Sequence, residues 1–181
     1  MEYTPVILFA FNRPEGLKAI IESLLQNEEA KHSVLYVFVD GPRFQRKGEV
    51  ENVEKVRDYV KSITGFKEVH YKFALQNKGL GNSVIKGVTE VINRYGKAIV
   101  LEDDLILAPN FLFFMNQGLD KYKEETSVFS ICGYSNKVKV PKDYSYDTYF
   151  CTRSSSWGWL LGLIAGIVWI GSWRISINTT Y

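Results

Sequence analysis

Lys97-Ala-Ile-Val-Leu-Glu-Asp-Asp104 joins an unbroken apolar run directly to three acidic residues. A continuous run of this kind is typical of a strand that is buried on both faces, as in a parallel sheet. The acidic residues stand where such a strand would end. This stretch therefore predicts a buried strand that carries Glu102, Asp103 and Asp104 at its carboxyl end.

Similar apolar runs occur earlier in the chain and alternate with segments of helical spacing. Strand and helix alternate four times, and the connections are too long for hairpins, which predicts βαβ units. The expected fold class is therefore α/β, a Rossmann-like three-layer αβα arrangement with a mainly parallel sheet. We expect strands at 5–11, 33–39, 68–75, 97–101, 128–132 and 148–151, and helices at 15–27, 48–63, 79–94 and 110–122.

Length and composition exclude several classes of protein. The chain has 181 residues, of which 46% are hydrophobic and 23% charged, as expected for one globular domain. The net charge of +2 and the lack of a clustered basic face predict that nucleic acid is not a partner. Two cysteines and an N-terminus without a signal-peptide pattern predict a cytoplasmic location.

The composition changes sharply near residue 153. All four tryptophans lie in the last 25 residues, and Arg174 is the one charged residue from Ser154 to Tyr181. We therefore divide the chain into a domain at 1–153 and an apolar tail at 154–181. The apolar core of the tail is shorter than a membrane span, which favours a buried or interfacial segment. Peripheral membrane contact through 157–173 is an alternative, since tryptophans suit a membrane interface.

Polar residues follow each of the four expected parallel strands. In such sheets, ligands bind beyond the carboxyl ends of the strands. The sequence therefore predicts one site that gathers polar residues from four separate segments: Phe11-Asn12-Arg13, Asp40-Gly41, Asn77-Lys78-Gly79 and Glu102-Asp103-Asp104.

The chemistry of these residues favours a nucleoside diphosphate bound with a divalent cation. Adjacent carboxylates repel one another, and a cation relieves that repulsion. Hard oxygen ligands prefer Mg²⁺ or Mn²⁺, which would stabilise charge on a phosphate leaving group. Arg13 and Lys78 could neutralise phosphate oxygens, and Asp40 could accept from a base imide or a ribose hydroxyl. Taken singly, the acidic triplet could be a solvated loop, and Asp40-Gly41-Pro42 could be a plain turn.

The order of these motifs resembles that of bacterial GT-A glycosyltransferases, both family-2-like enzymes and the N-acetylglucosaminyltransferase I type. The resemblance covers about residues 3–159. It is carried by Pro5-Val-Ile-Leu-Phe-Ala-Phe-Asn-Arg-Pro14, Val-Asp40-Gly, Asn77-Lys-Gly-Leu-Gly81, Leu101-Glu-Asp-Asp-Leu105 and Ser155-Ser-Trp-Gly-Trp159.

This resemblance implies an inverting, metal-dependent transfer of a sugar from a UDP-type nucleotide sugar to a glycan or other hydroxyl acceptor, as in polysaccharide biosynthesis. Asp104 would ligate Mn²⁺ or Mg²⁺ in a DXD-like motif, while Glu102 and Asp103 would face the sugar and ribose. Asp40 would hold the base, and Arg13 would lie near the nucleotide. Residues in the same donor site would include Phe11, Asn12, Asn77, Lys78 and Gly79.

The chain departs from the family pattern after Trp159. Family members usually continue with a polar stretch, whereas this chain continues with Leu160-Leu-Gly-Leu-Ile-Ala-Gly. Codons can be chosen for residues 160–173 that, with one added base, re-read as the polar family pattern. We therefore hypothesise a frameshift near codon 160 that truncates the enzyme and impairs turnover. The general base would lie in the lost segment, so we identify no catalytic residue.

Two other functions fit parts of the same pattern. A sugar-phosphate nucleotidyltransferase has a similar fold but needs a glycine-rich, basic loop after the first strand, and Phe11-Asn-Arg-Pro14 matches that loop poorly. An inactive or membrane-tethered nucleotide-sugar-binding module would bind UDP without turnover.

Overall fold

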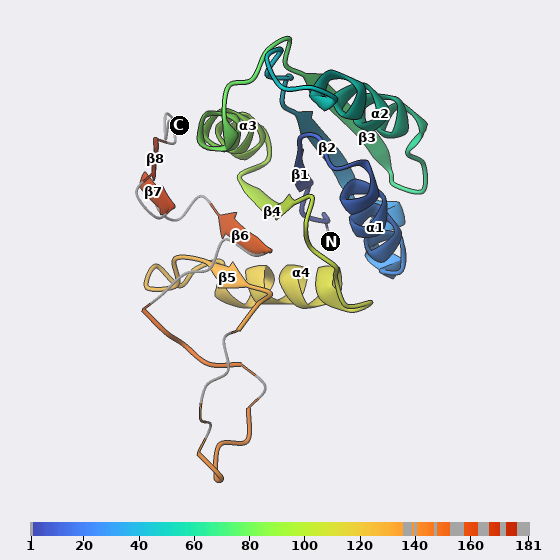
Figure 1. Ribbon diagram of the computed structural model, residues 1–181. Coiled ribbons are helices and arrows are strands. Elements are labelled where there is room, and N and C mark those ends of the chain that lie inside the picture. Colours follow the sequence, from blue (N-terminus) through green and yellow to red (C-terminus); the bar gives the residue numbers. More distant parts are fainter. Residues whose placement is uncertain are drawn as a thin grey trace.

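The protein is an α/β fold built on a six-stranded sheet, seen in a computed structural model (Figure 1). The structure describes residues 2–135, 139, 141–146, 148–152, 158–162, 167–170 and 173–176. The helices are α1 (Pro14–Leu25), α2 (Glu49–Ser62), α3 (Leu80–Tyr95) and α4 (Phe111–Tyr122), with a short 3₁₀ helix η1 (Glu28–His32). The strands are β1 (Val6–Ala10), β2 (Val34–Val39), β3 (Glu68–Phe73), β4 (Lys97–Glu102), β5 (Ile131–Cys132), β6 (Trp159–Gly162), β7 (Ile167–Ile170) and β8 (Trp173–Ser176).

The sheet is mainly parallel, with the order β3-β2-β1-β4-β6-β5. Strands β1 to β4 run parallel, and Val6 lies opposite both Leu35 and Ile99. Strand β6 is antiparallel to β4 and β5, and β7 pairs with β8 in a separate hairpin. The predicted α/β class with a mainly parallel sheet is thus confirmed.

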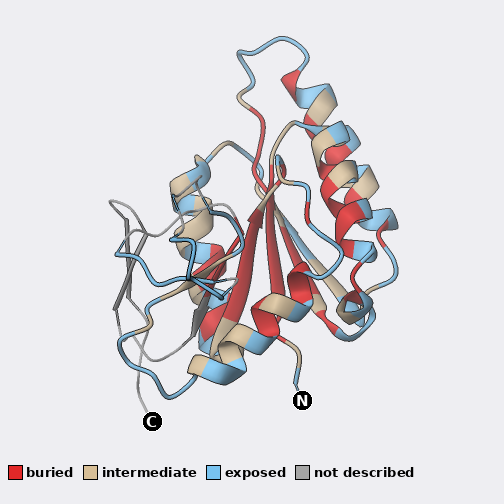
Figure 2. Cartoon of the chain, turned by 90° about the horizontal axis from the view of Figure 1, so that it is seen from below, coloured by how far each residue is buried: buried red, intermediate tan, exposed pale blue. Residues whose placement is uncertain are grey.

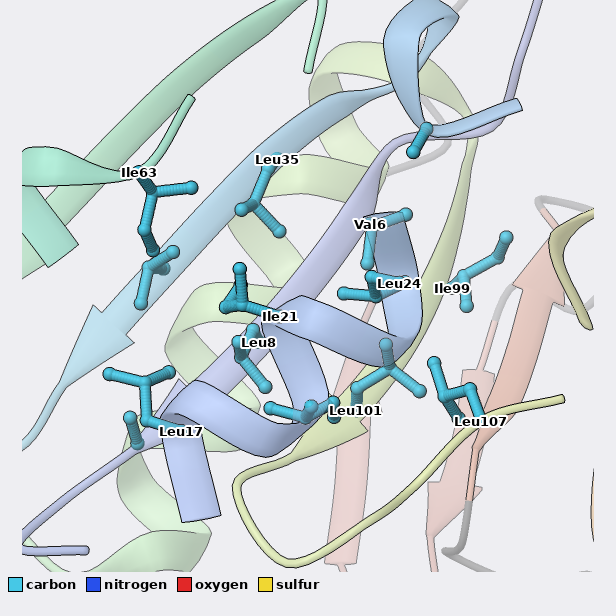
Figure 3. Close-up of a cluster of buried hydrophobic side chains, with 14 of the residues drawn as sticks. Val6, Leu8, Leu17, Ile21, Leu24, Leu35, Ile63, Ile99, Leu101 and Leu107 are labelled. Atoms are coloured by element: carbon cyan, nitrogen blue, oxygen red, sulfur yellow. The ribbon is translucent and has the colours of Figure 1, made fainter. Parts of the chain in front are cut away.

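The central strands β1, β2 and β4 are largely buried on both faces because helices cover each side of the sheet (Figure 2). In β1, Val6 and Leu8 join a cluster with residues of α1, α2 and α4, shown in Figure 3. Ile7 and Phe9 point to the other face, where they pack against residues of α3. This alternation explains the unbroken apolar run in the sequence, since neither face of β1 meets water.

Two expectations about strands need correction. The strand predicted at 128–132 is limited to β5, and residues 148–151 form no strand and are exposed. Here the tyrosines form loop contacts instead: Tyr144 Oη donates a hydrogen bond to the Thr148 carbonyl oxygen, 2.5 Å away, and Tyr149 Oη lies 2.6 Å from Ser135 Oγ. A short run of aromatic and β-branched residues such as Thr148-Tyr-Phe-Cys151 fits an exposed loop as well as a strand, so the pattern alone could not decide.

The first residues of the apolar tail contribute to the sheet. Trp159 and Leu160 in β6 are buried, and Leu160 pairs with Ile99 of β4. The predicted boundary at residue 153 lies outside the described residues, as do 157, 163–166 and 171–172 of the 157–173 segment expected to contact a membrane. Within the described part of the chain, no helix has both the length and the apolar character needed to span a bilayer.

Candidate functional site

The carboxyl ends of the four parallel strands meet along one edge of the sheet. The Asp40 amide donates to the Ala10 carbonyl oxygen at 3.0 Å, and the Ala74 amide donates to the Val39 carbonyl oxygen at 3.0 Å. On the other side of β1, the Phe11 amide donates to Asp103 Oδ2 at 3.0 Å. The first two bonds extend the backbone pairing by one residue beyond the strands, and the third joins the end of β1 to the Asp103 side chain. They place the predicted residues of β1, β2 and β4 on one continuous rim.

The acidic part of the rim follows β4 and leans against the start of α1. Asp103 is buried and fixed by the Phe11 amide, whereas Asp104 is exposed. A side chain at Gly16 would collide with the carbonyl oxygen of Asp103, so only glycine allows the first turn of α1 to approach so closely. The position of Asp103 therefore depends on the Phe11 amide, which binds its side chain, and on Gly16, which lets α1 approach its backbone.

Arg13 is the cation that faces these acids. Its Nη1 lies 3.2 Å from Asp104 Oδ2 and 3.8 Å from Asp103 Oδ1. Burial raises the pKa of Glu102, and the nearby charges of Asp104 and Asp103 raise it further. Burial also raises the pKa of Asp103, while the hydrogen bond from Phe11 and the charge of Arg13 oppose that rise. A positive charge at this position therefore stabilises the ionised forms of both groups.

The donor set at the acidic end fits a hard divalent cation that shares its ligands with a substrate. Mg²⁺ is commonly held by one or two carboxylates, with water and phosphate oxygens completing its coordination. Asp104, which is exposed, offers such a carboxylate. Within the described residues, no three histidine, cysteine, aspartate or glutamate side chains are grouped so that they could hold a metal by themselves.

Asp40 is the centre of a second cluster, at the end of β2. Its side chain is buried, with the residue 8% exposed, and both carboxylate oxygens accept hydrogen bonds. Oδ1 accepts from the amides of Gly41 and Lys78, each at 2.9 Å. Oδ2 accepts from Asn77 Nδ2 and from the Gly79 amide, each at 3.0 Å. Two donors on each oxygen fill the usual acceptor capacity of a carboxylate.

These bonds hold the segment after β3 against the end of β2. Asn77 also donates through Nδ2 to the Gly41 carbonyl oxygen at 3.2 Å. A side chain at Gly41 would collide with the backbone of Gln76, so the two segments are in direct contact. Lys78 contributes its backbone amide to this cluster, and its side chain is exposed. Asp40 therefore anchors the 77–79 segment, and a ligand base would have to replace one of its four donors.

An ion pair that the sequence analysis did not identify joins the two clusters. Glu49, at the start of α2, is only 5% exposed, and its carboxylate pairs with Arg43, with Nη2 to Oε2 at 2.5 Å. The Arg43 amide donates to Glu49 Oε1 at 2.7 Å, and Asn12 Nδ2 donates to Oε2 at 3.2 Å. The hydrogen bonds from Arg43 lower the pKa of Glu49 to about 2 although burial opposes them.

Phe11 links this ion pair to the acidic end of the rim. The guanidinium carbon of Arg43 lies 5.2 Å from the centroid of the Phe11 ring, within cation–π range. The backbone amide of the same Phe11 holds Asp103. The predicted residues thus form two clusters, one around Asp103 and one around Asp40, with Phe11 between them.

A groove of about 380 Å³ lies elsewhere on the sheet, between β2, β3 and α3. Tyr36 Oη lies 3.1 Å from Tyr95 Oη and accepts a hydrogen bond from Arg94 Nη1 at 3.0 Å. Burial and the hydrogen bond with Tyr95 raise the pKa of Tyr36 to about 12, so its hydroxyl stays protonated at neutral pH. None of the residues predicted for the site lines this groove.

The chain was compared with protein-family models and with solved structures. No protein-family model matches the chain, but solved structures align with it. A crystal structure of TarS from S. aureus aligns with 14% identity and a TM-score of 0.46, over 77% of this chain and 23% of that one. The structure of S. aureus TarS 1-349 aligns with 16% identity and a TM-score of 0.45, over 77% of this chain and 38% of that one. This chain thus spans well under two thirds of the length of either structure.

Proposed function

We propose that this chain is the donor-binding part of a glycosyltransferase of the GT-A type, which takes a UDP-type nucleotide sugar. The observation that carries the proposal is the rim itself. It combines an acidic cluster after β4, suited to a metal-bound diphosphate, with a loop anchored by Asp40 after β2, and β1 lies between them. The resemblance of the sequence motifs to those of GT-A enzymes supports the same function.

At the acidic end, Asp104 would bind Mn²⁺ or Mg²⁺, and Asp103 would hold the adjacent backbone in place. The cation would supply charge neutralisation for the diphosphate leaving group. Arg13 pairs with Asp104 in this structure at 3.2 Å, and its side chain is 59% exposed. If a cation took the place of Arg13 beside Asp104, the Arg13 guanidinium would be free to turn toward a phosphate oxygen. Glu102, at the end of β4, would face the sugar or ribose.

At the other end, the 77–79 segment would form one wall of the nucleoside site. Its shape depends on Asp40, because two of its backbone amides donate to that carboxylate. We therefore propose that Asp40 supports nucleotide binding by fixing this wall. A direct hydrogen bond between Asp40 and the nucleobase would require one of the four present donors to leave the carboxylate. Phe11 and Asn12 would lie between the nucleoside and diphosphate ends.

The proposed reaction is an inverting transfer. An acceptor hydroxyl oxygen forms a bond to the anomeric carbon while the bond from that carbon to the diphosphate oxygen breaks, with the electron pair leaving on the nucleoside diphosphate. The hydroxyl proton passes to a general base that the residues of this rim do not supply. The acceptor is a glycan or another hydroxyl compound in this proposal.

Calorimetry of UDP binding tests the proposal most simply. We expect UDP to bind in the presence of Mn²⁺ and to bind much more weakly without it. Asp104→Asn should abolish the dependence on Mn²⁺. Asp120→Asn is the matched control, since Asp120 is an exposed acid on α4 that pairs only with a nearby lysine at 3.4 Å, and it should bind as the parent chain does.

Failure to bind UDP by a chain with a cooperative thermal melt would contradict the proposal. If UDP binds equally with and without Mn²⁺, and Asp104→Asn has no effect, then the acidic cluster does not hold a cation for the diphosphate. A melt recorded by circular dichroism on the same samples separates both results from loss of fold.

A further inference from the structure

The two loops beside the Asp40 cluster are basic and lack acidic residues. We call residues 42–48 and 74–80 the rim loops; they read Pro-Arg-Phe-Gln-Arg-Lys-Gly and Ala-Leu-Gln-Asn-Lys-Gly-Leu. They carry four cationic side chains between them. No carboxylate lies within either loop, so any balancing charge must come from residues outside the loops.

The positive charge of three of these residues stays available to a partner. Arg43 is neutralised by the buried Glu49. Arg46, Lys47 and Lys78 are exposed, and none of them forms a salt bridge with any other described residue. Asp40, the acid next to the loops, is buried and faces four hydrogen-bond donors.

The same loops expose three large apolar side chains. Phe44 is 69% exposed, Leu75 is 88% exposed and Leu80 is 54% exposed. Single exposed apolar residues are common, but a group of them marks an interaction surface. The three side chains project from neighbouring loops, because the residues just before the first loop contact the second: Gly41 meets the backbone of Gln76, and Asp40 accepts from the amides of Lys78 and Gly79.

We propose that the rim loops bind the surface of an anionic lipid bilayer. Exposed aromatic and leucine side chains beside lysine and arginine are the composition that binds the interface of anionic membranes. Phe44, Leu75 and Leu80 enter the headgroup region, while Arg46 and Lys47 meet lipid phosphates. A groove for a peptide would enclose its apolar residues, whereas these project outward from two loops. This surface is separate from the C-terminal tail, and its binding requires neither nucleotide nor metal.

Membrane binding at this surface would also orient the candidate site. The rim loops start at the carboxyl ends of β2 and β3, which is the edge of the sheet that holds Asp40 and the acidic cluster. A bilayer bound there lies next to the donor site, so the proposed transfer would occur close to the lipid surface. That orientation rests on the proposed function, whereas the binding itself does not.

Vesicle co-sedimentation of the full chain tests the proposal. The vesicles are phosphatidylcholine alone or an equal mixture with phosphatidylglycerol, in low salt and without nucleotide or metal. We expect binding to the anionic vesicles and little to the neutral ones. Arg46→Gln/Lys47→Gln should weaken binding about 25-fold, at about fivefold for each cation removed. Phe44→Ser should weaken it about tenfold, as expected for loss of one inserted aromatic ring.

Matched controls lie at the opposite end of the sheet. Phe113 on α4 is 53% exposed, and α4 sits near the N-terminus through the bond from the Thr4 amide to Asn116 Oδ1. Phe113→Ser and the double variant Lys31→Gln/Lys67→Gln should bind vesicles as the parent chain does. A circular dichroism melt on every variant confirms that the fold is retained.

Three results would overturn the proposal. The first is a lack of binding to anionic vesicles by the folded parent chain. The second is equal loss of binding in the rim-loop variants and their matched controls. The third is unchanged binding in the rim-loop variants combined with loss of binding in Trp169→Ser/Trp173→Ser, which would assign membrane contact to the tail. Absence of UDP binding would contradict the proposed function and leave the vesicle result standing.

Discussion

Replacement of Asp40 by asparagine should destabilise the 77–79 segment, which forms one side of the candidate site. Asn keeps the shape of Asp but has one acceptor oxygen and an NH₂ group in place of two acceptor oxygens. Two of the four present donors, such as the Gly79 amide and Asn77 Nδ2, would then face another donor. The buried position of the side chain limits replacement of these bonds by water.

The expected size of this effect follows from the count of lost bonds. Hydrogen bonds to a charged group contribute about 1.5–3 kcal/mol each, so two lost bonds reduce the free energy of unfolding by about 3–6 kcal/mol. For a chain of this length, each kcal/mol corresponds to about 2–4 °C in Tm, so Tm should fall by at least about 6 °C. Amide exchange at Lys78 and Gly79 should accelerate most, because their acceptor is the altered group.

Thermal melts together with hydrogen exchange measured by NMR test this prediction. Asp104→Asn is the matched control: it makes the same chemical change on the same rim, but Asp104 is exposed and its partner Arg13 is solvated. An exposed pair of this kind contributes about 0–1 kcal/mol. If Asp40→Asn melts no lower than Asp104→Asn, or leaves exchange at Lys78 and Gly79 unchanged, the role given to Asp40 as the anchor of this loop is wrong.

Three further predictions follow from buried polar and glycine positions. Asn27→Ala removes a buried amide that makes three hydrogen bonds between α1 and the start of α4, and thermal melts should show a loss of about 3–5 kcal/mol. Gly41→Ala places a methyl group against the backbone of Gln76 and should cost about 1–3 kcal/mol, measured by urea unfolding. The pKa of Glu49 is lowered from 4.5 to about 2, so its stabilisation is present above pH 4.5 and is lost as pH falls toward 2. Urea melts across this range should therefore show the difference between the parent chain and Glu49→Gln shrinking as pH falls, and a constant difference would contradict the assignment.

The central strands could be predicted from sequence because their environment leaves a clear pattern. Strands β1, β2 and β4 are buried on two faces, and that burial requires the unbroken apolar runs that begin at Val6, Val34 and Ala98. Residues 148–151 show the limit of the approach. Whether four residues become a strand depends on an available sheet edge, and sequence spacing carries no information about that edge.

Part of the site could also be predicted from sequence. Parallel strands end on one edge, so the polar residues after them must gather there. Their hydrogen-bond partners could not be inferred in the same way. Asp40 is bound by amides from a segment after the next strand, and Glu49 lies in a helix that also carries exposed charged residues. The burial of Glu49 is visible only once Arg43 and Asn12 are placed around it.

The central claim is that the rim formed by Phe11, Asp40 and the acidic cluster binds a nucleoside diphosphate. A UDP titration in Mg²⁺, followed by backbone amide chemical shifts, tests it most directly. We predict that the largest shifts occur at Phe11, Lys78, Gly79 and Asp104, and that Asp104→Asn reduces them. Shifts confined to the groove around Tyr36, or no shifts in a folded chain, would contradict the claim.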